Sequence, residues 1–427
     1  MRRFGFFLFI LIFLCTARPV AQHPDKVYQP YIQSAQLFQY GNQQSIPLLN
    51  LNGTSRLQLE FDDMEGGYKN YYYTYQLCDY NWQPLQLNPF DYIKGFTQNR
   101  IGTYRNSSIA YTRYTHYQAL LPEANSMPMK SGNYLLKVYL DGDTSKLAFT
   151  RRLYVTDSKA IISGEVVQPL SAQYFNTHQK LRFNVTLKDI NSFSAAQQVK
   201  VVILQNNRMD NALKDIAPTF TRGNTLEYNS EHLGIFPGGK EWRWLDLRSL
   251  RLQSDRVDSA AYHANATEIF VKPDVDRRAQ RYVYFADLDG FYQVLTYETI
   301  NPFWQGDYAT VHFSYSPPDG KPYPGYDMYL LGGITQYDYS PQWKMKFNET
   351  TGTYQLDAFL KQGYYNYAYQ LVSQANPAEK ISLEGNYFET ENMYTVLVYY
   401  KSFTDRADQL IGVAAFNSRR DRPGISF

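Results

Sequence analysis

The side chains that could do chemistry in this chain are its histidines and a few groups of carboxylates. The six histidines form no His-x-x-x-His pair, and none lies beside a set of carboxylates. They are His23, His116, His178, His232, His263 and His312. A zinc site needs three or four converging ligands, so this spacing gives no support for a metal site.

Three short segments carry two or more carboxylates each, and each lies at a predicted turn. They are Asp62 to Glu65, Asp141 to Asp143, and Asp287 to Asp289. The last, in Asp-Leu-Asp-Gly, resembles part of a calcium loop but lacks the remaining oxygen ligands and the final Glu. Solvated turns in which Asp caps backbone amides explain these segments better than the acid pair of a glycosidase.

Motifs for other catalytic chemistry are also missing from the sequence. There is no Gly-x-Ser-x-Gly elbow, no phosphate-cradling glycine loop and no dinucleotide fingerprint. We therefore expect a protein that is not an enzyme, with no catalytic residue, no cofactor and no metal.

The elements that carry these side chains are predicted to be strands. Tyrosine supplies 40 of the 427 residues, and Tyr and Phe favour strands. Between Gly363 and Val372, tyrosines occupy every second position at Tyr365, Tyr367 and Tyr369, which is the period of a strand. No long capped segment with helical periodicity occurs. The sequence predicts an all-β protein of immunoglobulin-like antiparallel β-sandwich domains in series.

Three strand-rich blocks follow one another and give the expected domains. The first sandwich is expected over residues 22–156, the second over 157–317 and the third over 318–427. The stretch from Ser316 to Gly325 has four prolines and two glycines, which indicates a linker or long turn between the last two.

A Gly-x-Tyr pattern opens one strand in each block, at Tyr134, Tyr308 and Tyr365. In immunoglobulin-like sandwiches a tyrosine at such a place bonds back to the loop that the chain has just left. The preceding glycine lets the chain turn sharply. We therefore expect three structural tyrosine corners.

Residues 1–21 are typical of a secretory signal peptide. Two arginines precede an apolar run from Phe4 to Leu14, and small residues follow, with cleavage expected after Ala17 or Ala21. The bulky residues before Cys15 argue against a lipoprotein. No later segment has 18 consecutive apolar residues, so we expect an exported protein without a membrane-spanning helix.

The exported chain is expected to be nearly neutral. Loss of Arg2, Arg3 and Arg18 lowers the basic residues from 42 to 39, against 40 acidic ones. This balance gives no basic field for nucleic acid. Only Cys78 would remain, so no internal disulfide could form, and its neighbours predict that it is buried in a core.

Residues 240–256 are rich in tryptophan and arginine, and residues 276–281 form a short basic run, which is most often a solvated loop. Arginine stacks on indole and binds carboxylates in pairs of hydrogen bonds, which suits a protein interface. An amphipathic strand whose arginines cover its tryptophans explains the first segment equally well. The expected partner-interface side chains are Trp242, Trp244, Arg248, Arg251, Arg277 and Arg278.

Seven segments, taken together, resemble the plug protein family of the type IX secretion system of Bacteroidota. They occur in the family's order over nearly the whole chain after residue 21. They span residues 75–96, 114–122, 131–139, 241–251, 287–294, 306–313 and 391–418. The resemblance implies a periplasmic protein, peripheral to the outer membrane, that docks on the translocon barrel and closes its periplasmic opening. That role needs a protein interface and no small-molecule ligand.

The third block is also similar to an early-set sandwich of the glycogen-binding kind. It has Tyr337 and Tyr339 where that kind carries its aromatic platform. The shared positions are Leu331, Gly332, Gly352, Tyr354, Leu360, Gly363, Tyr365 and Tyr367. An exported glycan-binding or polysaccharide-utilisation accessory protein is therefore the alternative function. A weaker third interpretation is an outer-membrane strand barrel.

Overall fold

The computed structural model describes residues 24–188, 190 and 194–421. The predicted signal peptide, residues 1–21, lies outside the described residues. The prediction of an all-β protein is confirmed: strands dominate, and they form three antiparallel-rich sandwiches. The helices among the described residues are single turns of three or four residues, and none could cross a membrane. They are η1 (Pro89–Asp91), α1 (Ala195–Gln198), α2 (Pro302–Gln305), η2 (Gly333–Thr335) and η3 (Pro341–Trp343).

Sandwich 1 is the N-terminal unit and packs two sheets face to face. One sheet has the order β1 (Lys26–Val27), β12 (Leu147–Thr156), β11 (Gly132–Leu140), β5 (Tyr71–Cys78) and β7 (Asn99–Arg100), with β3 (Leu48–Asn50) beside β12. The other has the order β2 (Ile32–Gln39), β4 (Leu57–Asp63), β9 (Thr115–Leu121) and β8 (Thr103–Asn106). A small ribbon joins β6 (Ile93–Gly95) to β10 (Ser126–Pro128).

The alternation of side chains explains this sandwich. Along β5, Tyr71, Tyr73 and Tyr75 point into the core and are fully buried. The ring of Phe61 on β4 stacks on Tyr117 at 5.1 Å between centroids. Large rings on alternate positions therefore fill the space between the two sheets.

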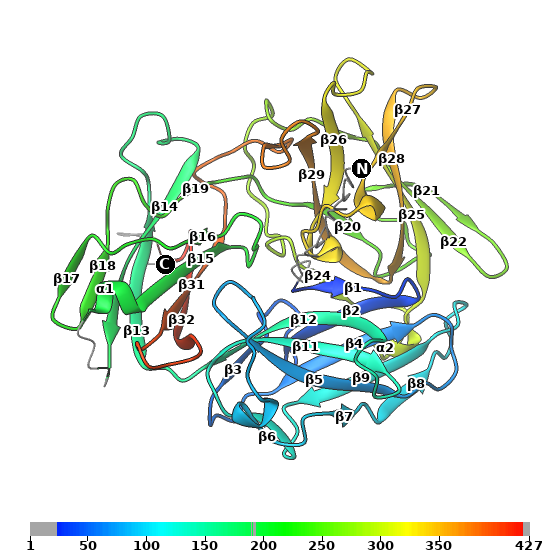
Figure 1. The fold of residues 1–427 in the computed structure, drawn as a ribbon. Helices are drawn as coiled ribbons and strands as arrows, with labels where there is room; N and C mark the ends of the chain where they lie inside the picture. The colour runs from blue at the N-terminus through cyan, green and yellow to red at the C-terminus, as the bar shows by residue number, and fades with distance from the viewer. Residues whose placement is uncertain (1–23, 189, 191–193, 422–427) are drawn as a thin grey trace, which may run out of the picture.

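Sandwich 2 is built from two stretches of the chain that are far apart in sequence. Its first sheet has the order β13 (Ala160–Val167), β14 (His178–Leu187), β18 (Thr225–Tyr228) and β17 (Phe220–Arg222), with β19 (Ile235–Pro237) beside β14. Its second has the order β16 (Leu213–Lys214), β15 (Val199–Gln205), β31 (Met393–Tyr400) and β32 (Gln409–Asn417). In Figure 1 the red and orange strands β31 and β32 lie among the green strands of this unit.

Sandwich 3 lies between those two stretches in the sequence. One sheet has the order β20 (Arg243–Asp246), β29 (Gly363–Ser373) and β24 (Tyr292–Val294), with β26 (Tyr326–Leu331) and β30 (Lys380–Ser382) also paired to β29. The other has the order β21 (Val257–Tyr262), β22 (Thr267–Val271), β25 (Tyr308–Ser316), β28 (Thr353–Lys361) and β27 (Lys346–Asn348), with β23 (Asp274–Val275) beside β25.

The expected division at residue 317 does not follow these pairings. β15 pairs with β31 along its whole length, from Val199 opposite Tyr400 to Gln205 opposite Tyr394. The strands on either side of residue 317, β25 and β26, share the core of sandwich 3. The chain thus leaves sandwich 2 after β19, builds sandwich 3, and returns for β31 and β32. The proline-rich stretch is a turn inside sandwich 3.

Candidate functional site: the seams and the arginine network

The three sandwiches touch one another pairwise, and each contact, which we call a seam, has its own chemistry. The seam between sandwiches 1 and 2 is apolar. From sandwich 1 it takes Cys78, Trp82, Leu135 and Tyr154, and from sandwich 2 it takes Val202, Leu204, Leu397, Tyr399 and Leu410. A buried hydrogen bond crosses it, from the Tyr399 hydroxyl to Asn133 Oδ1 at 2.8 Å. Tyr80 adds bonds to Asp408 and Asp215 nearer the surface.

Cys78 is fully buried, which confirms the expectation from the sequence, and it lies in this seam. Burial raises the pKa of its thiol to about 12. Because the thiolate is the reactive form, this cysteine should be chemically inert in the folded protein.

The seam between sandwiches 1 and 3 contains a buried polar network. Asp62 on β4 accepts hydrogen bonds from His116 Nδ1 at 2.7 Å and from the Tyr308 hydroxyl at 2.5 Å, and it pairs with Lys361 Nζ. His116 Nε2 contacts Glu60 at 2.6 Å. The side chains of Glu60, Asp62, His116 and Lys361 are each 1–2% exposed. Two carboxylates and two cations therefore form a buried network.

The ionisation of the network follows from its geometry. Burial alone would lower the pKa of His116, but its contacts with Asp62 and Glu60 outweigh burial and raise the pKa above its usual value of 6.5. Burial would raise the pKa of Asp62, yet Lys361 and His116 hold it below its usual value of 3.8. A doubly protonated imidazole can donate to both carboxylates at once.

This network corrects two expectations. Asp62 was expected in a solvated turn, but it lies in β4 and is buried. Tyr308 was expected to form a tyrosine corner, but its hydroxyl contacts Asp62 and Ser34 of sandwich 1. The other two tyrosines have the corner bond: Tyr134 donates to Lys130 O at 2.8 Å, and Tyr365 donates to Lys361 O, each four residues upstream.

The seam between sandwiches 2 and 3 contains the two tyrosines of the glycogen-binding comparison. The Tyr339 hydroxyl donates to Asp210 Oδ2 at 3.1 Å, and Arg208 lies 5.5 Å from the centre of the Tyr337 ring. Arg208 also forms an ion pair with Asp210 at 2.7 Å. These two tyrosines thus contact sandwich 2 where a glycan platform would face solvent.

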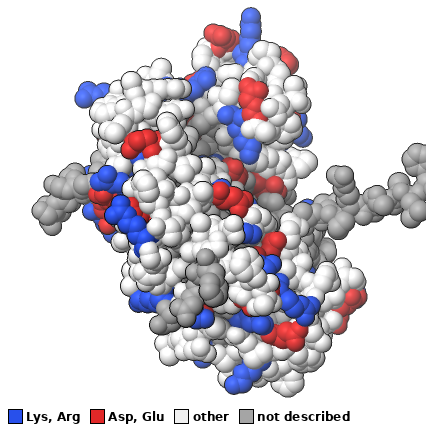
Figure 2. All heavy atoms as spheres, turned by 60° about the vertical axis from the view of Figure 1, so that its left-hand side comes forward, with Lys and Arg blue, Asp and Glu red and all other residues white. Residues whose placement is uncertain are grey.

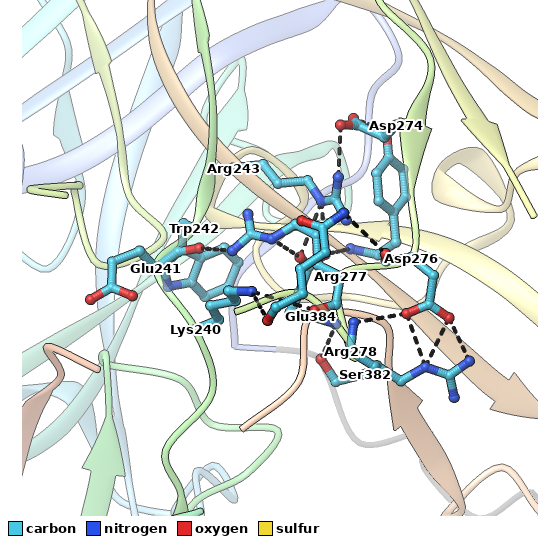
Figure 3. Close-up of polar contacts among 12 residues, drawn as sticks. Lys240, Glu241, Trp242, Arg243, Asp274, Asp276, Arg277, Arg278, Ser382 and Glu384 are labelled. Carbon is cyan, nitrogen blue, oxygen red and sulfur yellow. Dashed lines mark hydrogen bonds and ion pairs between the residues drawn. The ribbon is translucent and has the colours of Figure 1, made fainter. Parts of the chain in front are cut away.

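The arginine-rich segments meet in a second buried network (Figure 3). Arg243 on β20 binds Glu384 at 2.9 Å and Asp274 at 2.7 Å. Arg277 pairs with the same Glu384 at 3.2 Å and donates to the Glu241 carbonyl at 2.7 Å. Arg243, which was not among the residues expected at an interface, is therefore the centre of this network.

The six residues expected at a partner interface divide into two groups. Trp242 is 7% exposed and the Arg277 side chain 11%, so both lie in the interior. Trp244 is half-buried against Phe285. Arg248, Arg251 and Arg278 reach the surface; Arg248 pairs with Asp246 and Arg278 with Asp276.

In the turn Asp287 to Asp289 the capping predicted from the sequence is present, but the turn is not solvated as expected, because burial raises the pKa of both carboxyls. Asp287 accepts from the amides of Trp242 at 2.5 Å and Asp289 at 2.7 Å, and burial raises its pKa to about 7. Within the described ranges no three His, Cys, Asp or Glu side chains are placed to share a metal ion.

A surface that the sequence analysis missed lies at the edge of the seam between sandwiches 1 and 3. The loop between β8 and β9 meets the loop between β24 and β25 there. Asp307 accepts a hydrogen bond from the amide of Tyr111, and Gln362 bonds to both Asp307 and Glu298. The two loops expose four large apolar side chains, which we call the seam patch: Ile109 (75% exposed), Tyr111 (65%), Tyr297 (67%) and Ile300 (99%). Arg248 lies 4.5 Å from the ring of Tyr297.

Charged side chains on one face of the molecule are mixed in sign. Figure 2 shows a face on which basic and acidic side chains are interspersed over a mostly uncharged surface. This agrees with the near-neutral composition. Recognition by this protein thus depends on local contacts more than on a long-range field.

Comparison with known proteins places these features in a family. The sequence pattern of the type 9 secretion system plug protein 1st domain matches residues 32–157, which is sandwich 1 from β2 onwards. No curated protein matches the sequence. The crystal structure of a hypothetical protein from Parabacteroides merdae is similar over 92% of this chain and 98% of that one, with 30% identity and a TM-score of 0.87. The chain belongs to the type 9 secretion system plug protein family.

Proposed function

We propose that this protein is a non-catalytic periplasmic plug. It docks on the outer-membrane translocon barrel of the type IX secretion system and closes the periplasmic opening of that barrel. The observation that carries the proposal is its membership of the plug protein family. Exported plugs of this kind would associate peripherally with the outer membrane.

The construction of the molecule supports this role. A stopper must be wider than a loop and must resist bending under contact with its partner. Three sandwiches joined by three seams meet that need. Separating sandwiches 1 and 3 would take Lys361 away from Asp62 and leave the remaining charges of the buried network without one of their partners. Separating sandwiches 1 and 2 would expose an apolar cluster.

The seam patch is the surface that we assign to docking. Tyrosine and isoleucine side chains exposed on two loops that are hydrogen-bonded to each other favour a protein partner over solvent. The neighbouring Arg248, which the sequence indicated as an interface residue, adds a cation at the rim. Hot spots of this composition contribute most when the contact excludes water.

Membrane permeability tests the proposal. A pore wide enough for folded cargo would also admit large antibiotics, so deleting the plug gene should sensitise cells to vancomycin. Deleting the barrel gene as well should remove the sensitivity. Sensitivity that persisted without the barrel would contradict plugging, as would micromolar binding of a glucan with no barrel co-purifying.

Variants of the surface test the docking assignment separately. The double variant Tyr297→Ser/Ile300→Ser should co-purify with less barrel while its unfolding transition stays unchanged, since both side chains are exposed. Leu170→Ser is the matched control, because Leu170 is 77% exposed on sandwich 2. Equal recovery of the barrel by the double variant and the wild type would assign docking to another face.

A further inference from the structure

A cavity of about 110 Å³ lies where the three sandwiches meet. Its wall includes Arg151 from sandwich 1, Asn207 from sandwich 2, and Tyr292 and Tyr337 from sandwich 3. It shares Arg151 and Tyr292 with an adjoining cleft of about 450 Å³ between sandwiches 1 and 3. A molecule inside it would therefore contact all three units.

Arg151, on β12, is a buried cation with no carboxylate partner. Its side chain is 5% exposed. The guanidinium donates only to backbone carbonyls, namely Ala35 O at 2.7 and 3.2 Å and Thr150 O at 2.7 Å. In the part of the chain that the structure describes, no Asp or Glu forms an ion pair with it. Asp25, which also lines the cavity, attracts Arg151 but forms its ion pair with Arg152.

Among the described residues the other buried Lys and Arg side chains have a carboxylate partner, so Arg151 differs from them. Arg208, Arg243 and Lys361 each contact at least one carboxylate. Arginine stays charged in proteins, so it cannot escape burial by losing its proton. A buried charge without a counter-ion is strongly unfavourable. The site thus has an excess of one positive charge.

Further polar atoms in the cavity wall lack partners. Gln36 and Tyr337 line the cavity, and Gln36 Oε1 and the Tyr337 hydroxyl are buried without a hydrogen bond from the described residues. Water could satisfy such atoms, but it would leave the charge of Arg151 uncompensated. Arg152 itself already pairs with Asp25.

The backbone of the wall is also strained. Gln336 and Tyr337 are consecutive residues with φ of +52° and +55°, and Asn206 and Asn207 have φ of +52° and +55°. Side-chain-bearing residues rarely adopt this conformation, and such residues cluster at binding sites. Of these residues Gln336, Tyr337 and Asn207 line the cavity. Asn tolerates this conformation, whereas Gln336 and Tyr337 adopt it at a cost.

We propose that this cavity binds a small carboxylate-bearing molecule whose carboxylate pairs with Arg151. A single carboxylate matches the single uncompensated charge, and a guanidinium binds it through parallel hydrogen bonds. The Tyr337 hydroxyl is a further donor for the ligand. The site is separate from the seam patch and does not depend on docking. The sequence predicted no small-molecule ligand, because the groups of this site come from distant parts of the chain.

Binding should be measured on the exported full-length chain by calorimetry and thermal unfolding. The probes are acetate, succinate, a short peptide with a free C-terminus, the same peptide amidated, and inorganic phosphate. We expect saturable binding of a carboxylate and a higher melting temperature, since a ligand that binds only the folded state stabilises it. Tighter binding of the free peptide than of its amide and the small acids would identify a peptide terminus as the carboxylate source.

Two variants identify the residues. Arg151→Met should weaken binding at least about tenfold, whereas Arg182→Met, which removes an exposed arginine on sandwich 2, should leave it unchanged. Tyr337→Phe removes only an unpaired hydroxyl, so it should fold normally and still bind more weakly. Absence of saturable carboxylate binding at millimolar concentration would overturn the proposal. So would wild-type affinity in Arg151→Met and Tyr337→Phe as well as in the control Arg182→Met, or phosphate binding as tightly as the best carboxylate.

Discussion

Replacing Lys361 by Met should destabilise the protein strongly, although Lys361 lies far from the surface patch assigned to docking. Lys361 pairs with Asp62 and donates to Phe303 O at 2.5 Å, and its side chain is 1% exposed. The variant leaves Glu60 and Asp62 with His116 as their only cation. Removing one partner of a buried ion pair costs about 3–5 kcal/mol, mostly because the remaining charge stays buried and unpaired.

The free energy of unfolding should be measured by guanidinium denaturation at pH 7.5. Lys146→Met is the matched control: Lys146 pairs with Asp141 at 3.2 Å, but both side chains are more than half exposed. Such a surface pair contributes about 0–1 kcal/mol. The double variant Asp62→Asn/Lys361→Met should recover part of the loss, because it removes both charges together. A Lys361→Met cost no larger than that of Lys146→Met would refute the claim that the seam depends on its buried charges.

Three further predictions follow from the seams and the corners. The pKa of His116 is raised in the folded protein, so between its usual value of 6.5 and that higher pKa the folded state binds more protons than the unfolded state. The free energy of unfolding should therefore fall as pH rises through this window. His116→Gln should flatten this dependence when denaturation is measured at several pH values. Tyr134→Phe leaves Lys130 O without its donor and should cost about 1–2 kcal/mol of unfolding free energy without changing barrel recovery; a cost below about 0.3 kcal/mol would show that the corner bond is dispensable. Cys78 should resist alkylation until the protein is denatured, and rapid labelling of the native protein, followed by mass spectrometry, would contradict its burial.

The local sequence pattern was sufficient to predict the strands and two of the three tyrosine corners. Tyr365, Tyr367 and Tyr369 alternate in sequence, and all three are buried on one face of β29. The Gly-x-Tyr pattern found two tyrosines that bond back to their own loops. It failed at Tyr308, because a buried hydroxyl takes the strongest acceptor within reach, and the Asp62 carboxylate of another sandwich is a stronger acceptor than a loop carbonyl.

Contacts between distant segments could not be predicted from the local sequence pattern. Lys361 and Asp62 are 299 positions apart, and nothing near either residue indicates the other. Asp62, followed by Asp63 and Glu65, has the composition of a solvated turn, and only the packing of sandwich 3 on β4 makes it a buried anion. For the same reason Arg277, in a basic run typical of a surface loop, lies in the interior against Glu384.

The interleaved path of the chain gives the plug a physical advantage over domains in series. Serial domains are joined by one linker, which permits a hinge. Here the chain crosses between sandwiches 2 and 3 twice, and the crossings are bonded to each other: Tyr387 N donates to Gly239 O at 2.9 Å, and Gly239 N donates to Asn386 Oδ1 at 3.1 Å. They pass so closely that a Cβ on Gly238 would lie 2.0 Å from Tyr387 O. Rotation of sandwich 3 against sandwich 2 must bend both crossings and break these bonds, so the body should move as one piece against its partner.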